Sequence, residues 1–415
     1  RIISQAIGSR AKILVYGDYD ADGITGTACL YRFLRDLGAE VGCMVPHRLL
    51  DGYGVHKHLI ERAVHEGYRC IITVDCGTTD VAPLRYALKS GLSVVVTDHH
   101  RVPSDLNVDW PLINPKRLPS EDGLWELSGS SMAFLLAVSI RRFLREKGFF
   151  RRRREPDLKG YLGLVTIGMV ADRVNLSGNQ TRLLVKNGLE ELNRSEEFVL
   201  TYLKELSSLE TRRLNTEDIG FRLAPRINAP GRIGDPKVAL EALIGDDEKR
   251  VRSLVDLMES LNNRRRTMEE ELLKEVENEI RVKYREPPLL ILCHKEDWHE
   301  GILGLVASKV STNHYRPTLI LRSKGGILKG SGRSIPEVDL FELIKTQSHL
   351  LLKFGGHSGA VGLSLDLSAL DSFEEALSSQ LQERLNLTSL VPTPYIDMEL
   401  DLRELTIEDV EALKR

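Results

Sequence analysis

The sequence predicts an α/β protein in which a larger domain with a parallel sheet and a smaller α/β domain are joined by a long helix. The first observation is that short apolar runs alternate with amphipathic helical stretches over residues 11 to about 100, and again from residue 289. The second is a long stretch from Asp246 that contains neither Gly nor Pro. Alternating strands and helices imply right-handed crossovers and a parallel sheet covered on both faces.

The expected strands of the first domain are short runs rich in Val, Ile and Leu, at 12–16, 41–45, 70–74 and 92–97. The helices between them have apolar residues at helical spacing and are expected at 24–37, 55–66 and 82–90. A mainly helical part follows, with helices at 132–145, 179–193 and 198–206. We therefore expect residues 1–245 to form one catalytic domain.

Residues 246–286 are expected to form the connector helix, because their apolar side chains lie on one face and acidic residues begin the stretch. Pro287 ends it. Strands at 289–293 and 318–321 and helices at 301–310 and 339–351 then define a second domain over 287–387. Residues 388–415 have the pattern of a linker, a short strand and a helix that is cut short. We expect them to begin a further, truncated module.

The composition is that of a globular protein. Lys and Arg number 57 against 60 Asp and Glu, so the net charge of −3 does not by itself indicate nucleic-acid binding. No apolar run approaches the roughly 18 residues of a membrane span, so no membrane association is expected. Five scattered cysteines indicate reduced thiols and a cytoplasmic location. The first residues lack both Met and a signal-peptide pattern, which favours a piece of a longer chain.

Acidic and imidazole side chains gather where the predicted strands end. They are Asp18, Asp20 and Asp22 after the first strand, Asp75 after the third, and Asp98, His99 and His100 after the fourth. The carboxyl ends of parallel strands share one edge of the sheet, where open α/β folds bind ligands. Asp172, in the run TIGMVADRV, is a further candidate.

So many carboxylates repel one another unless a cation neutralises them. Mixed carboxylate and imidazole ligands suit Mn²⁺ or Mg²⁺, and this number of ligands suggests two ions. The expected chemistry is hydrolysis of a phosphate ester or anhydride by a water that the two metals activate. Alternatives remain for single residues: Asp75 as a helix cap, Asp98 as a group that orients an imidazole, and Asp172 as a cap or a partner of Arg173. The convergence of three strand ends favours the metal centre.

Several basic, hydroxyl and aromatic residues are candidates for contact with the substrate. Arg333 between Ser331 and Ser334, and the segment Gly355-Gly356-His357, are expected in turns that grip phosphate or sugar, although tight turns without a ligand are the alternative. Trp298 and His299 lie in an expected loop, where the indole is a candidate for base stacking or for core packing.

Other candidates lie in the first domain and the connector. Arg48 and Tyr53 follow the second strand, and Arg48 is the candidate for a 5′-terminal phosphate. Arg226, Asn228 and Arg232 are expected in a loop broken by Pro and Gly, and Arg264 on the connector helix. The basic run 151–154 stays unassigned.

The motifs resemble those of the DHH phosphoesterase superfamily. They are DYDADG at 18–23, VDCG at 74–77, DHH at 98–100 and VAD at 170–172. Further stretches resemble its bacterial exonucleases specific for single strands: VPHRLLDGYG, FRLAPRINAPGRIGD, WHEGILGLVASKV, GSGRSIP and GGHSGAVGLSL. These occur in the order of that family from Lys12 to about Leu365. Residues 128–134, SGSSMAF, match less closely.

The resemblance implies a Mn²⁺- or Mg²⁺-dependent nuclease that removes 5′-mononucleotides from single-stranded DNA in the 5′→3′ direction, in repair and recombination. It implies Asp20, Asp22, Asp75, His99 and Asp172 as metal ligands, with Asp18 and His100 beside them. It also implies a DHH-associated domain over the second α/β region and an OB-fold beyond the last residue.

The resemblance further implies a monomer whose partners are single-stranded DNA, a single-strand-binding protein and a repair helicase. Two alternatives remain. One is a phosphodiesterase of short oligonucleotides or cyclic dinucleotides, and the other is an inactive relative that only binds single strands.

Overall fold

The computed structural model describes residues 1–119, 121, 123–284, 288–384, 390–394, 396, 398–401 and 403–413. The chain divides into two compact units, Arg1–Glu270 and Glu271–Arg415, and the boundary falls within the long helix α12 (Glu248–Lys283). Each unit contains a five-stranded sheet, so the predicted α/β class is confirmed. Pro287 and Leu387, the bounds that we expect for the second domain, lie outside the described residues.

The sheet of the first unit is parallel throughout, with the order β2-β1-β3-β4-β5. Its strands are β1 (Ile13–Gly17), β2 (Val41–Met44), β3 (Cys70–Val74), β4 (Ser93–Thr97) and β5 (Leu112–Ile113). The first four lie at the predicted places, and the two-residue β5 has no clear sequence signal. The chain passes outward from β1 to β2 and then returns to β3 on the other side of β1. This reversal opens the crevice in which such sheets hold their ligands.

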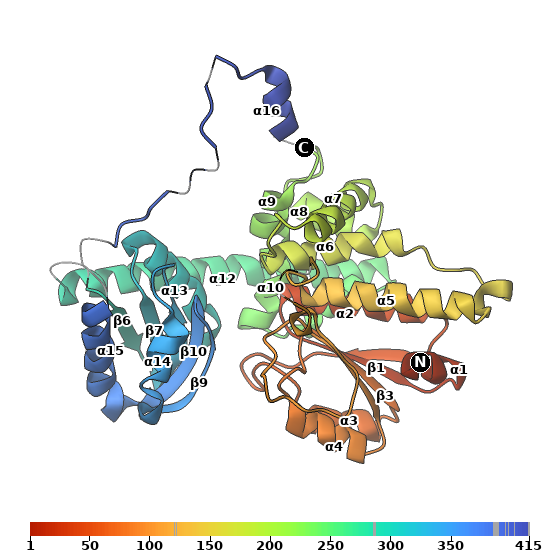
Figure 1. The fold of residues 1–415 in the computed structure, drawn as a ribbon, viewed down its shortest axis with the longest axis horizontal. Helices are drawn as coiled ribbons and strands as arrows, with labels where there is room; N and C mark the ends of the chain where they lie inside the picture. The colour runs from red at the N-terminus through yellow and green to blue at the C-terminus, as the bar shows by residue number, and fades with distance from the viewer. Residues whose placement is uncertain are drawn as a thin grey trace. The chain divides into compact units, whose positions relative to one another are not determined.

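Helices cover both faces of this sheet (Figure 1). One layer contains α2 (Ala21–Asp36) and α5 (Gly129–Glu146), which bury Phe33 and Ala137 in the same core as Ile13 and Val15. The other contains α3 (Lys57–His65) and α4 (Val81–Lys89), whose apolar residues pack with Leu14 and Tyr16. The side chains of successive β1 residues therefore pack in the cores on opposite faces of the sheet, which explains why the strand is buried at every position.

The helical part of the first unit follows the sheet. Its longer helices are α6 (Leu162–Ala171), α7 (Asn179–Arg194), α8 (Phe198–Leu206), the π-helix η4 (Ile219–Leu223), α10 (Ala224–Ile233) and α11 (Lys237–Ile244). The remaining elements of this unit are α1 (Ile2–Gly8), η1 (Pro115–Arg117), η2 (Phe149–Arg152), η3 (Leu158–Tyr161) and α9 (Thr216–Asp218). The expectation of a loop at 226–232 is wrong, because α9, the π-helix η4 and α10 form one continuous helical stretch over 216–233. Pro225 directly follows the π-helix, a place where helices are locally irregular, and Pro230 lies inside α10.

The second unit has a mixed sheet with the order β6-β7-β8-β10-β9, in which only β6 and β7 pair in parallel. Its elements are β6 (Ile291–Lys295), α13 (Glu300–His314), β7 (Thr318–Lys324), β8 (Ile327–Arg333), α14 (Leu340–Lys345), η5 (Ser348–Leu350), β9 (Leu351–His357), β10 (Ala360–Asp366), η6 (Leu367–Ala369), α15 (Leu370–Arg384) and α16 (Ile407–Leu413).

Three expectations for the second unit are corrected. The glycine-rich segments that end at Arg333 and His357 are strands, not turns. The helix expected over 339–351 ends at Lys345. None of the described residues between 390 and 401 forms a strand. In the described part of the chain, no helix is long and apolar enough to span a membrane.

Candidate metal centre

The carboxyl edge of the parallel sheet gathers the acidic and imidazole residues that the sequence singles out. Three groups have ligand atoms that all lie within 4.8 Å of one another: Asp18, Asp20 and Asp75; Asp22, His99 and Asp172; and Asp75, His99 and His100. Asp75 and His99 each occur in two groups. The arrangement therefore offers two neighbouring cation positions with shared ligands, which is the geometry of two-metal sites.

The turn after β1 places three carboxylates through one local motif. Asp20 is the N-cap of α2, and its Oδ1 accepts hydrogen bonds from the backbone N–H groups of Asp22 and Gly23 at 3.0 Å. A Cβ at Gly23 would lie 2.7 Å from the Cβ of Asp18, so only glycine lets the helix begin beside that carboxylate. Asp20 is thus a helix cap and also belongs to the cluster.

Asp75 has a strained backbone, as residues at functional sites often do. Its φ of 63° lies in the left-handed region, which an Asp tolerates better than a branched residue does. Its Oδ1 lies 3.1 Å from Nε2 of His99. A Cβ at Gly129 would lie 2.4 Å from the Cβ of Asp75, so glycine at the start of α5 allows the helix to approach it.

Asp98 organises the loop after β4. Its Oδ1 accepts a hydrogen bond from the backbone N–H of His99 at 2.7 Å and lies 2.7 Å from Nδ1 of His100, while Oδ2 accepts from the N–H of Thr78 at 3.0 Å. Burial opposes ionisation of Asp98, but these hydrogen bonds and the charge of His100 hold its pKa below the ordinary value. Asp98 therefore acts as a positioning residue for His100.

The two histidines of this loop differ in their protonation. Burial lowers the pKa of His99, which favours the neutral imidazole that binds metals. Burial also works against the charge of His100, but the hydrogen bond to Asp98 outweighs it and raises the pKa of His100 to about 9. His100 is therefore protonated at neutral pH when no metal is bound.

A serine shell around Asp22 has no counterpart among the predicted site residues. Asp22 Oδ1 accepts a hydrogen bond from Oγ of Ser128 at 2.9 Å and from the backbone N–H of Ser130 at 3.1 Å. A Cβ at Gly168 would lie 2.6 Å from the same oxygen. The available signal was the run of small residues at 128–131, which lets α5 and α6 approach α2 closely.

The carboxyl groups of Asp18, Asp75 and Asp172 ionise less readily than ordinary ones. Burial and the neighbouring carboxylates raise the pKa of Asp18 and of Asp75 well above the usual range, and they raise the pKa of Asp172 to about 8. Within the described residues, Oδ1 of Asp18, Oδ2 of Asp22 and Oδ1 of Asp75 are buried and accept no hydrogen bond. A buried acceptor without a donor costs free energy, because it has lost its hydrogen bonds to water. A coordinated cation would remove that cost.

These observations fit two divalent ions of the Mn²⁺ or Mg²⁺ kind. The donor atoms are carboxylate oxygens and imidazole nitrogens, and no thiolate belongs to the three groups among the described residues. The expected ligands Asp20, Asp22, Asp75, His99 and Asp172 all belong to the groups, and so do Asp18 and His100.

Two further predicted residues lie at the rim of the centre. Arg48 packs its guanidinium over the ring of Tyr19 at 5.1 Å, and its charge acts on Asp18. The hydroxyl of Tyr53 donates to the carbonyl oxygen of Asp75 at 3.2 Å and lies 2.9 Å from Nδ1 of His100.

The residues predicted in the 226–232 segment have different roles. Asn228 Oδ1 accepts a hydrogen bond from the backbone N–H of Ala21 at 2.9 Å and so fixes the first turn of α2. Arg226 is mostly buried and paired with Glu259 at 2.5 Å, so the expectation that it lines a substrate channel is not supported. Arg232 is half-buried, and its charge acts on Tyr19. Arg264 is exposed on α12.

The candidates of the second unit lie around α13 and the glycine-rich strands. Trp298 is 4% exposed and its indole N–H donates to Glu275 at 3.0 Å, so it packs in the core and offers no face to a base. Nδ1 of His299 accepts from the N–H of Gly301 and caps α13. The expectation of base stacking on Trp298 is therefore wrong.

The predicted phosphate-gripping residues come from neighbouring strands. A Cβ at Gly304 of α13 would lie 2.9 Å from a guanidinium nitrogen of Arg333 and 3.4 Å from Oγ of Ser331, so glycine leaves room for both side chains. Ser334 Oγ donates to the carbonyl oxygen of Val338 at 2.7 Å. On β9, Gly355, Gly356 and His357 are exposed.

The fold and the site are those of the DHH family. The model of the DHH family N-terminal domain matches residues 12–169, and that of the DHHA1 domain matches residues 286–383. Curated relatives include the single-stranded-DNA-specific exonucleases RecJ of Dickeya dadantii, 36% identical, and of Escherichia coli, 33% identical. Each alignment covers 100% of this chain and 74% of the relative. The chain therefore belongs to the RecJ family.

Solved structures agree with this assignment. The crystal structure of RecJ from Thermus thermophilus in complex with Mn²⁺ matches with a TM-score of 0.79 and 30% identity, over 92% of this chain and 53% of that one. A second exonuclease RecJ structure, bound to manganese, matches with a TM-score of 0.75 and 32% identity over 92% of both chains. The Thermus protein has also been solved with Mg²⁺, with a TM-score of 0.72.

Proposed function

We propose that this chain hydrolyses single-stranded DNA from the 5′ end, releases 5′-mononucleotides and depends on two Mn²⁺ or Mg²⁺ ions. The observation that carries the proposal is the convergence of buried carboxylates with unsatisfied oxygens on one sheet edge. The relatives are single-stranded-DNA-specific exonucleases, which supports single-stranded DNA as the substrate class. The expected biological setting is DNA repair and recombination in the cytoplasm.

The two ions, when bound, supply an activated water and neutralise charge that develops on the scissile phosphate. The protein holds the carboxylates in place through the N-cap of α2, the serine shell of Asp22 and the loop fixed by Asp98. His100 carries a proton at neutral pH, because Asp98 stabilises the imidazolium. We assign to His100 the transfer of that proton from Nε2 to the departing O3′ of the released nucleotide.

Recognition of the 5′ end is assigned to Arg48, with Tyr53 beside it. The guanidinium of Arg48 stacks on Tyr19 next to the acidic cluster, so it can pair with a terminal phosphate near the scissile bond. This assignment supports the 5′→3′ direction.

The strand beyond the first nucleotide requires further contacts. We assign these to Arg232 and Arg264 in the first unit and to Ser331, Arg333, Ser334, Gly355, Gly356 and His357 in the second. Arg333 offers planar donors, and Gly355 and Gly356 are exposed on the edge strand β9. We further propose a catalytic domain over 1–245, a connector over 246–286 and a substrate-binding domain over 287–387, followed by a linker that begins at residue 388. The protein acts as a monomer, with a single-strand-binding protein and a repair helicase as partners.

The experiment that tests this function compares the products from one DNA strand labelled at either end. With Mn²⁺, a 5′-label is expected to appear first in mononucleotides, while a 3′-label stays in a steadily shortening strand. A duplex of the same sequence should resist. Hydrolysis confined to dinucleotides or cyclic dinucleotides would favour a phosphodiesterase of small substrates, and binding without hydrolysis would favour an inactive relative.

A further inference from the structure

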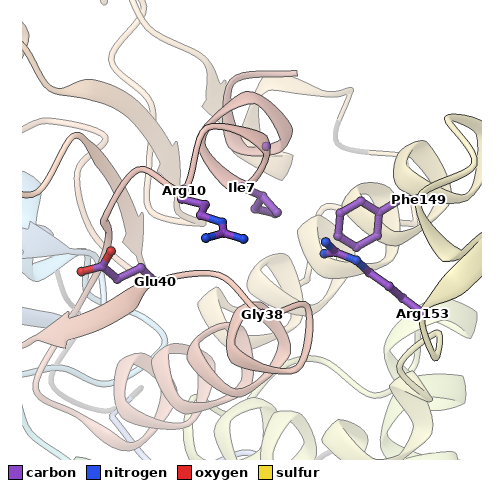
Figure 2. A pocket seen from close by; sticks show the side chains of 7 residues that line it. Ile7, Arg10, Gly38, Glu40, Phe149 and Arg153 are labelled. Carbon is purple, nitrogen blue, oxygen red and sulfur yellow. The ribbon is translucent and has the colours of Figure 1, made fainter.

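A cavity of about 330 Å³ lies at the edge of the parallel sheet opposite the metal centre. Arg10 precedes β1, and Gly38 and Glu40 precede β2, whereas the metal-binding residues follow the strands. Phe149 and Arg153, from the segment after α5, complete the walls that Figure 2 shows. None of the residues that we assign to the proposed hydrolysis therefore lines this cavity.

Two guanidinium groups approach this cavity from opposite sides. Figure 2 shows the side chains of Arg10 and Arg153 directed toward one another, while the carboxylate of Glu40 points away from both. Within the described part of the chain, neither arginine forms an ion pair with a carboxylate, and both are exposed. Like charges that converge without a counter-ion repel, so an anion between them is favoured.

The basic character continues beyond the cavity. The unassigned run 151–154 is exposed at every position, and no ion pair involves it among the described residues. The neighbouring Arg141 and Arg145 of α5 differ, because both form ion pairs with Glu155. Within residues 141–154, which the structure describes in full, the arginines without an acidic partner are those in and next to the cavity.

The cavity is remote from the catalytic chemistry. The first residue of α5, Gly129, lies against Asp75, and the helix runs for 18 residues before the segment that lines the cavity. At 1.5 Å per residue this places the cavity about 27 Å from the metal centre along the helix. A ligand can therefore occupy the cavity without touching the reacting phosphate.

The apolar walls and the stacked arginine indicate what kind of anion fits. The guanidinium of Arg153 lies 4.4 Å from the ring centroid of Phe149, and Phe150 meets the same ring edge-on at 5.3 Å. One face of the Phe149 ring is therefore covered by Arg153. Because proteins hold single strands by stacking bases on free aromatic faces, this arrangement does not favour a nucleic-acid ligand. Ile7 and the edge of Phe149 instead provide an apolar wall between cations, which suits an apolar side chain flanked by carboxylates.

We propose that this basic cavity, defined by Arg10, Arg153, Phe149 and Ile7, binds an acidic peptide segment of a partner protein. Carboxylates of the segment pair with the two arginines, and one apolar side chain enters between them. The remaining arginines of the run 151–154 extend the contact along an acidic stretch. The site lets a partner tether the enzyme while its metal centre stays free.

The test is fluorescence anisotropy with a short labelled peptide of aspartate and leucine and an otherwise identical asparagine–leucine peptide. The protein should bind the acidic peptide and not the neutral one. The double variant Arg10→Ala/Arg153→Ala should weaken binding by about tenfold or more, because two charge-assisted contacts are lost. The control is Arg142→Ala on α5, whose side chain pairs with Glu146 outside the cavity and whose loss removes one positive charge from the same helical region. This control should stay within about twofold of the unchanged protein.

Three results would overturn the proposal. They are equal peptide binding by the double variant, an equal loss in Arg142→Ala, and a loss of duplex DNA binding in the double variant while the peptide fails to bind the unchanged protein. The last result would assign the cavity to nucleic acid. Hydrolysis of a short single strand with Mn²⁺ should be unchanged in the double variant, so the outcome does not depend on the proposed nuclease activity.

Discussion

Ser128 Oγ donates a 2.9 Å hydrogen bond to Oδ1 of Asp22, and the other oxygen of that carboxylate, Oδ2, accepts no hydrogen bond among the described residues. The serine thus fixes one oxygen and leaves the other without a hydrogen bond, in a carboxylate that lies in the cluster with His99 and Asp172. Hydrogen bonds of this kind orient metal ligands and tune their affinity.

Ser128→Ala should therefore weaken Mn²⁺ binding by about 10-fold or more. The loss arises because Asp22 can rotate away from the ion. Isothermal titration with Mn²⁺ measures it directly. The matched control is Ser131→Ala, which removes a buried hydroxyl of the same helix that bonds only to the carbonyl oxygen of Ser128. Equal Mn²⁺ affinity in Ser128→Ala and the unchanged protein would show that the serine has no orienting role.

Asp98→Asn should destabilise the loop after β4 and lower the pKa of His100 from about 9. Asparagine cannot supply the charge that stabilises the imidazolium. Its amide nitrogen also cannot accept the hydrogen bonds that one of the two carboxylate oxygens of Asp98 accepts. We expect the free energy of unfolding to fall by about 1–3 kcal/mol at neutral pH. NMR titration of His100 and urea unfolding of the metal-free protein measure the two effects.

The pH dependence of the Asp98 effect follows from the sign of each shift. The raised pKa of His100 adds stability that is present below its ordinary value near 6.5 and is lost as pH rises through about 9. The lowered pKa of Asp98 adds stability that is lost only in acid. The destabilisation by Asp98→Asn should therefore be smaller above pH 9 than at neutral pH. A constant difference would contradict the ionic pairing.

Metal binding and proton release should be linked through Asp172. Its pKa of about 8 means that the metal-free carboxyl is largely protonated at neutral pH, whereas an ion requires the charged form. A raised carboxyl pKa also makes the metal-free protein less stable as pH rises through that value. The increase in Tm caused by Mn²⁺ should therefore grow between about pH 6 and 9. An increment independent of pH would refute this linkage.

Arg48→Ala should remove the preference for a 5′-phosphate. The Arg48 guanidinium lies over Tyr19 and its charge acts on Asp18, so loss of its contact with a terminal phosphate should lower kcat/KM by about tenfold on 5′-phosphorylated DNA. A strand with a 5′-hydroxyl should lose little. Arg62→Ala on α3, which removes an exposed arginine paired with Glu66, is the control. Equal losses on both strands would exclude Arg48 as the phosphate contact.

The sheet and its acidic edge can be predicted from local sequence, because short apolar runs such as 70–74 form buried strands and the acids after them lie at one edge of a parallel sheet. The burial of individual polar and aromatic residues cannot be predicted in this way. Arg226 pairs with Glu259 and Trp298 with Glu275, and these acids lie far along the chain. Their partners depend on how helices pack, which periodicity does not specify.

The glycine-rich strands show a second limit. Gly330 and Gly356 have the sequence character of turn residues, yet both lie in strands. A Cβ at Gly330 would lie 2.1 Å from the carbonyl oxygen of Ile320 on β7, and one at Gly356 would lie 2.2 Å from that of Ala360 on β10. Glycine is required there because neighbouring backbones approach closely, and that distance is set by the sheet as a whole.

The most direct test of the metal-dependent hydrolysis is the release of mononucleotides from a 5′-labelled single strand by Asp75→Asn, with Mn²⁺ and with EDTA. Asparagine tolerates the left-handed backbone at this position, so the variant should fold. The control is Asp157→Asn, whose carboxylate caps a short helix by accepting from the N–H of Lys159. With Mn²⁺, Asp157→Asn should be fully active, whereas Asp75→Asn should release no mononucleotides and still bind the strand. In EDTA, neither variant nor the unchanged protein should be active. Undiminished release by Asp75→Asn, or by the unchanged protein in EDTA, would contradict it.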